Sequence, residues 1–128
     1  IINVNDEKFL APESMIEAVT SAAGRTLSVG GMAYLVFNSL AQSYAESLRG
    51  LEKLTGETFD TLNIIGGGSK NTLLNELTKE STGKRVITGP TEGTAIGNLM
   101  MQMIGSGELS GVEAGREMIT RSFDVAEV

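Results

Sequence analysis

The feature that most constrains the fold is a short apolar run that passes directly into three consecutive glycines. Residues 61–65 read Thr-Leu-Asn-Ile-Ile and are followed by Gly66, Gly67 and Gly68. A run of this length with β-branched residues, ended by glycine, is typical of a buried strand that meets a sharp loop. Leucines then recur at helical spacing within residues 73–81, so the segment predicts a strand, a glycine turn and a helix in direct succession.

A second strand and helix repeat this order further along the chain. Residues 85–88 predict a strand ended by the Gly89-Pro90 turn, and apolar residues recur at helical spacing over residues 96–104. Strands joined by a helical crossover run parallel, because the crossover returns the chain to the same end of the sheet. The sequence therefore predicts a helix-rich α/β fold with a short parallel sheet.

Further helices are expected before and after these strands. Residues 15–23 carry apolar side chains at helical spacing and stop at Gly24, and residues 32–54 form the longest apolar stripe, ended by Gly56. Residues 28–31, between these two helices, are expected to form a turn or a strand remnant.

The last helix is expected to open with a capping box. Ser110 and Glu113 have the spacing of that motif, and an amphipathic pattern then runs to Phe123. Met100, Met101 and Met103 also lie at helical spacing, which favours core packing over a metal-binding cluster.

Only two strands are visible in the sequence. A two-stranded parallel sheet leaves edge N–H and C=O groups unpaired and one apolar face half covered. We therefore expect residues 1–128 to be one incomplete part of a larger domain, and the missing starting methionine agrees with this. The apolar surface left exposed on such a part would invite self-association.

Composition excludes several classes of function. The chain has 10 basic and 16 acidic residues, a net charge of −6, which disfavours nucleic acid and anionic membranes as partners. No apolar run reaches the roughly 18 residues of a membrane span. The chain has no cysteine and no histidine, so disulfides, thiolate metal sites and the commonest general base are excluded. The reducing cytoplasm is the expected compartment.

The glycine turn at residues 66–71, Gly-Gly-Gly-Ser-Lys-Asn, is the strongest chemical signal. Without Cβ atoms a ligand can lie against bare backbone, and the N-terminus of the next helix suits a phosphate or the polar edge of a heteroaromatic ring. A purely structural turn that needs positive φ angles would use the same residues, so the pattern alone leaves both interpretations open.

Two known glycine motifs can be excluded. A dinucleotide fingerprint needs a third glycine where Asn71 stands, and a Walker loop fails because Gly83 and Lys84 are followed by Arg85. No carboxylate pair suggests an acid–base dyad. Glu92 would either help to place Mg²⁺ or cap the adjacent helix, and local capping is favoured.

The turn and its flanks resemble a family motif. Residues 64–71, Leu74-Asn75 and residues 82–86 together resemble the adenosine-side motif of the FGGY carbohydrate kinases. Residues 89–98 are similar to the family's segment in which a Thr-Ala-hydrophobic-Gly run opens a helix. Within the family, the chain looks most like the members that phosphorylate rhamnulose. This likeness lies in residues 6–15 and in Ser39, Leu40, Ala41 and Tyr44. The resemblance covers nearly the whole chain.

This resemblance implies a fold, a reaction and a site. Residues 1–128 would be the C-terminal part of the family's C-terminal domain, which has an actin-like (ribonuclease H-like) ATPase fold. The parent protein would transfer the γ-phosphoryl group of ATP, with Mg²⁺, to a hydroxyl of a ketose, L-rhamnulose. Gly66 and Gly67 would pass beneath the nucleotide near its adenosine and α-phosphate. Gly68 and Ser69 would shape the turn, and Asn71 would contact the adenine or ribose edge.

The resemblance also places the catalytic aspartate, the phosphate-clamping hairpin and most of the sugar pocket upstream. No catalytic or metal-ligating residue is therefore expected here, and the isolated chain is expected to lack turnover. This sequence departs from the family pattern at residues 30–34, at Asn38 and at Arg85. These departures leave the nucleotide turn intact but affect the assignment of the sugar. The alternative from another class is a non-catalytic, actin-like nucleotide-binding or interaction domain.

Overall fold

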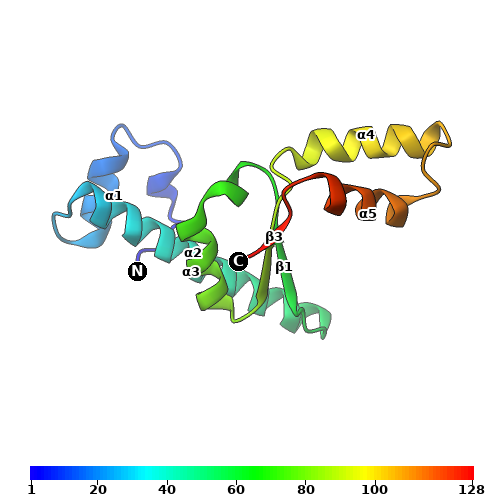
Figure 1. Ribbon diagram of the computed structural model, residues 1–128. Coiled ribbons are helices and arrows are strands. Elements are labelled where there is room, and N and C mark those ends of the chain that lie inside the picture. Colours follow the sequence, from blue (N-terminus) through cyan, green and yellow to red (C-terminus); the bar gives the residue numbers. More distant parts are fainter. The chain divides into compact units, whose positions relative to one another are not determined.

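The computed structural model describes all of residues 1–128, which divide into two compact units. The helical unit comprises Ile1–Phe59 and Glu76–Gly83, and the sheet unit comprises Asp60–Asn75 and Lys84–Val128. Figure 1 labels most of the elements of both units along the chain. None of the helices combines the length and the apolar character that crossing a bilayer requires.

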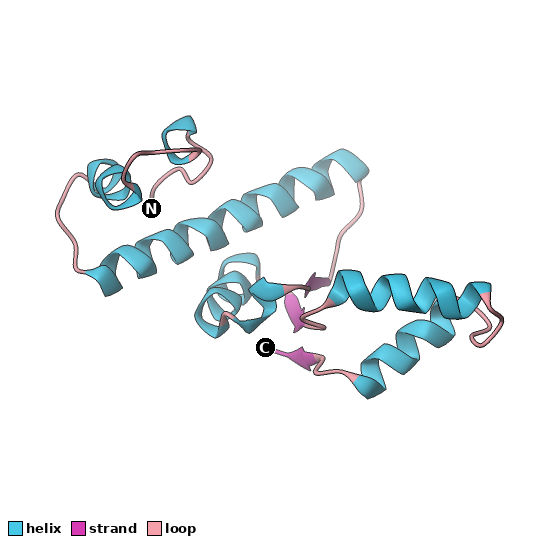
Figure 2. Ribbon diagram, turned by 90° about the horizontal axis from the view of Figure 1, so that it is seen from above, coloured by secondary structure: helices cyan, strands magenta, loops and turns pink.

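The helical unit contains the short 3₁₀ helix η1 (Glu7–Phe9) and the helices α1 (Met15–Ala23) and α2 (Val29–Thr55). The Ser14 side chain caps α1 by accepting the N–H of Glu17, and Gly24 ends the helix in the left-handed conformation at φ 67°. The predicted helix and its glycine stop are therefore confirmed. Figure 2 shows α2 as the longest helix of the chain.

Helix α2 begins earlier than the sequence predicts. The Ser28 hydroxyl accepts the N–H of Gly31 at 3.1 Å, so the helix starts at Val29 and includes Gly30 and Gly31 in its first turn. The prediction of a turn or strand remnant at residues 28–31 was wrong. A good serine cap contributes about 1 kcal/mol, which offsets the low helix propensity of a glycine in the first turn.

The N-terminal segment is fixed to α2 by a buried hydroxyl. Ser39 is buried and accepts the N–H of Ile2 at 3.0 Å while donating to the carbonyl of Leu35 at 2.7 Å. Further along, Asp6 caps η1; the backbone N–H of Lys8, followed by its ammonium group, lowers the pKa of the Asp6 carboxyl. These contacts order a segment that would otherwise be irregular.

The sheet unit is built on the predicted parallel pair. Strands β1 (Thr61–Ile64) and β2 (Arg85–Thr88) are parallel, with Thr61 opposite Arg85, and helix α3 (Thr72–Thr82) joins them. The predicted strand, turn, helix and strand are therefore confirmed. A third strand, β3 (Ala126–Glu127), was not predicted; it pairs antiparallel with β2, so the sheet is mixed, in the order β1-β2-β3.

Helices α4 (Gly93–Gly105) and α5 (Val112–Ser122) form an antiparallel hairpin and lie side by side in both Figure 1 and Figure 2. Gly115 is buried at their crossing, where a Cβ atom would collide with the Met100 side chain. Core packing therefore explains Met100. Met101 does not follow the prediction, because it is 55% exposed.

The predicted capping box of α5 is not formed. Gly111 occupies the cap position and no side chain caps the helix. Glu113 instead accepts a hydrogen bond from the Arg116 guanidinium at 2.9 Å, an exposed pair three residues apart. The motif fails because Ser110 lies one residue before the cap, which moves Glu113 out of the position that the box requires.

Gly89, which follows β2, lies against the backbone at Asp124, and this close approach can be tested. It has a φ of +91°, and a Cβ there would collide with the carbonyl oxygen of Asp124. We expect Gly89→Ala to lower the free energy of unfolding by at least about 1–2 kcal/mol, measured by urea denaturation. The matched control is Gly50→Ala in the exposed middle of α2, with open space around it, which should raise stability by about 0.5–1 kcal/mol. Equal effects of the two substitutions would contradict this account.

Candidate functional site

The glycine turn begins where β1 ends and is tied to the loop that follows β2. Gly66 donates its N–H to the carbonyl of Pro90 at 3.1 Å, and Gly89 donates to the carbonyl of Ile64 at 2.9 Å. These two bonds continue the parallel pairing beyond the strand ends, so both loops lie side by side at the carboxyl edge of the strands. In parallel α/β sheets ligands bind outside this edge.

The turn itself is the short 3₁₀ helix η2 (Gly67–Lys70), closed by Ser69. Both the N–H and the hydroxyl of Ser69 donate to the carbonyl of Gly66, at 3.1 and 2.7 Å. The polar groups of Ser69 are therefore directed into the turn.

The three glycines differ in what they require. Gly66 has a φ of 78° and is needed for its backbone conformation. Gly67 and Gly68 have no positive φ and are exposed, and a Cβ atom added to either would meet no other atom within 4 Å. Their N–H groups meet no acceptor in the chain. Neither strain nor packing accounts for glycine at positions 67 and 68, so bare backbone faces solvent there without an intramolecular reason.

Asn71 caps helix α3. Its Oδ1 accepts the N–H of Leu74 at 3.1 Å, and its own N–H donates to the carbonyl of Gly68 at 3.1 Å. The cap engages the side-chain carbonyl and leaves the Nδ2 group as the part that can donate to a ligand.

Asn75 belongs to this turn; the sequence analysis named it only as part of the resembling motif and gave it no role in the site. It is 1% exposed, and its Nδ2 donates to the carbonyl of Ser69 at 2.9 Å. Its Oδ1 is buried and finds no donor. The signal was present, because Asn75 lies four residues after Asn71, on the same face of a helix.

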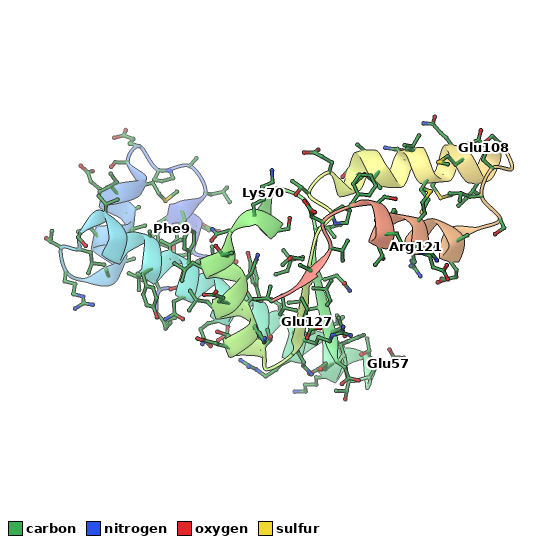
Figure 3. The ribbon with its side chains drawn as sticks, in the orientation of Figure 1. Phe9, Glu57, Lys70, Glu108, Arg121 and Glu127 are labelled. Carbon is green, nitrogen blue, oxygen red and sulfur yellow. The ribbon has the colours of Figure 1, made fainter.

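Charged groups near the turn are few. Lys70 projects outward from η2 and is exposed (Figure 3). Glu92 stands at the cap position of α4 but its side chain makes no capping bond, so the expected local capping by this carboxylate was wrong. No three His, Cys, Asp or Glu side chains of residues 1–128 come together as a metal site.

A cavity of about 690 Å³ lies in the same unit, against the loops that follow β1 and β2. Ile65, Pro90, Ile96 and Ile119 give it a largely apolar lining, and Arg116 is its one charged lining residue. The exposed backbone of the turn and this apolar lining are both surfaces that a ligand can contact.

The chain is similar to known proteins over nearly its whole length. Residues 2–106 match the FGGY family of carbohydrate kinases, C-terminal domain. The chain is 42% identical to a rhamnulokinase of Oceanobacillus iheyensis, over 98% of this chain and 28% of that protein. It is 40% identical to one of Lactiplantibacillus plantarum (97% and 26%) and 38% identical to one of Bacillus subtilis (97% and 27%). The chain thus spans about a quarter of the length of these relatives.

The cap made by Asn71 leads to a stability prediction. Asn71→Ala removes the oxygen that accepts the Leu74 N–H and should lower the free energy of unfolding by about 1 kcal/mol. Asn71→Ser keeps an acceptor at the cap and should stay within a few tenths of a kcal/mol of the wild type. Urea denaturation of both variants checks this; equal losses would mean that the cap does not stabilise α3.

Proposed function

This chain belongs to the FGGY family of carbohydrate kinases, and we propose that it forms one wall of the ATP site of a kinase that phosphorylates L-rhamnulose. The family match confirms the resemblance drawn from the glycine turn and its flanks, and with it the actin-like ATPase fold class. We propose the reaction, the nucleotide contacts and the sugar on the grounds that follow.

One observation carries the nucleotide part of the proposal. Gly67 and Gly68 present exposed N–H groups and no side chain, although neither the conformation nor the packing of the chain requires glycine there. A ligand that lies directly on this backbone supplies the missing reason. The turn precedes the N-terminus of α3, where the helix dipole favours an anion.

Each residue of the site has a proposed role. Gly66 and Gly67 run beneath the nucleotide near the adenosine and α-phosphate, while Gly68 and Ser69 set the shape of the turn. Asn71 donates from its Nδ2 group, which the cap does not use, to an acceptor of the adenine or ribose. This surface binds and orients the nucleotide, which is much of what phosphoryl transfer asks of a protein.

ATP and Mg²⁺ fit the chain differently. The open backbone at Gly67 and Gly68 is a cradle that side chains would fill, so ATP fits it. Bound ATP supplies the phosphoryl group. These residues contain no carboxylate cluster that would hold Mg²⁺.

The sugar is assigned from the relatives. The three proteins are named rhamnulokinase and align with nearly all of this chain, including the long helix α2. We propose L-rhamnulose as the acceptor, with the catalytic base and the sugar pocket provided by the rest of the polypeptide. We assign the reaction to the cytoplasm, the compartment that supplies ATP.

The nucleotide contact can be tested at Gly67. Gly67→Leu places a side chain in open space, so stability should change by less than about 0.5 kcal/mol, as at an ordinary surface position. The side chain would occupy the ligand's place, and we expect the Kd for ADP to rise more than tenfold by calorimetry. Gly50→Leu, equally open but on α2, is the control and should bind ADP normally. Tight ADP binding by Gly67→Leu would refute the proposed nucleotide contact.

The reaction is tested with the intact polypeptide that carries this sequence. With ATP, Mg²⁺ and L-rhamnulose it should form ADP and a phosphorylated ketose, measured by a coupled assay and by mass spectrometry of the product. Residues 1–128 alone should give no turnover under the same conditions. ADP binding by the intact polypeptide without transfer to any ketose would favour the non-catalytic nucleotide-binding alternative.

A further inference from the structure

We propose that Asn75 is a positioning residue of the nucleotide site, whose buried amide holds the glycine turn in the shape that presents Gly67 and Gly68 to the nucleotide. The inference rests on the proposed function, because a fixed turn matters only if a ligand uses it. Asn75 is too deeply buried, at 1% exposure, to touch the ligand. It acts through the carbonyl group of Ser69.

The contacts around Ser69 explain how one amide controls the turn. The Nδ2 of Asn75 donates to the Ser69 carbonyl at 2.9 Å, and the N–H and hydroxyl of Ser69 both donate to the carbonyl of Gly66. Both peptide groups that flank the Ser69 Cα are thereby held. Gly67 and Gly68, which lie between the two anchored carbonyls, have no side chains to restrain them. Their orientation therefore depends on the bonds made at Ser69.

The Oδ1 atom of Asn75 indicates that this residue does not serve stability alone. Its Oδ1 is buried without a donor. A buried acceptor that is left unpaired costs more free energy than one hydrogen bond returns. The amide cannot simply be turned over, because its oxygen would then face the carbonyl oxygen of Ser69. For folding alone, an apolar side chain of the same branched shape, such as leucine, avoids this cost.

Buried polar groups are usually hydrogen-bonded, and exceptions such as the Oδ1 of Asn75 are expected at functional sites. An ordered turn loses less conformational freedom when the nucleotide binds, so the benefit of Asn75 appears in affinity and not in stability. This separation gives the proposal a distinctive signature. Removing the amide should weaken nucleotide binding while leaving the fold as stable as before or more stable.

The test is Asn75→Leu in the intact polypeptide, with ADP as the probe. We expect the Kd for ADP, measured by calorimetry, to rise about three- to tenfold, the range that one hydrogen bond supports. The melting temperature should be unchanged or higher. Amide hydrogen exchange in residues 67–71 of the unliganded protein should become faster. In the kinase assay the KM for ATP should rise and the KM for L-rhamnulose should not.

Thr78→Val is the matched control, since Thr78 lies about one turn further along α3 and is equally buried. It should leave the Kd for ADP unchanged. If Asn75→Leu binds ADP as tightly as the wild type, the inference is overturned while the proposed function stands. Parallel losses of melting temperature and affinity in both variants also overturn it. A wild type that does not bind ADP overturns the proposed function as well.

A second variant covers the case in which Asn75→Leu does not fold. Asn75→Ala removes the donor to the Ser69 carbonyl and the unpaired Oδ1 without adding volume or charge. Weakened ADP binding together with faster exchange in residues 67–71 supports the proposal. Wild-type affinity and wild-type exchange in this variant overturn it.

Discussion

The site depends on the parallel pairing of two four-residue strands and its continuation into their loops. Thr61 to Ile64 lie in register with Arg85 to Thr88, and the next two bonds, Gly89 to Ile64 and Gly66 to Pro90, join the segments that follow. Because the strands are parallel, both loops leave the sheet at the same edge. An antiparallel pair would have sent them to opposite ends, and no shared surface would exist.

Two asparagines, one at the cap of α3 and one within α3, restrain the turn and the start of the helix. Asn71 uses its side-chain carbonyl to cap α3, while Asn75 uses its amide to hold Ser69 and buries its carbonyl. Two asparagines four residues apart thus bond through opposite ends of the same kind of side chain. Around a glycine segment with little stiffness of its own, the restraint has to come from such neighbours.

Local signals in the sequence predicted most of the fold. Helix ends at Gly24 and Gly56 are set by the left-handed conformation that glycine accepts, which is a property of single residues. The start of α2 was missed because the Ser28 cap lets the helix include Gly30 and Gly31, a pair that by itself favours a turn. Strand β3 was missed because two residues carry no pattern; its pairing depends on a partner 38 residues away in sequence, between Thr88 and Ala126. In the site, the glycines could be predicted, whereas the burial of Asn75 is a tertiary property.

The net charge of −6 would by itself oppose the binding of an anionic ligand. At physiological salt the Debye length is about 8 Å, so distant carboxylates are screened and the groups at the turn decide the local potential. Those groups are the free N–H dipoles of Gly67 and Gly68, the N-terminus of α3 and the exposed ammonium of Lys70. These groups favour negative charge, whereas the Glu92 carboxylate at the cap of α4 opposes it. The proposed nucleotide site therefore depends on a local arrangement of backbone dipoles, which composition does not reveal.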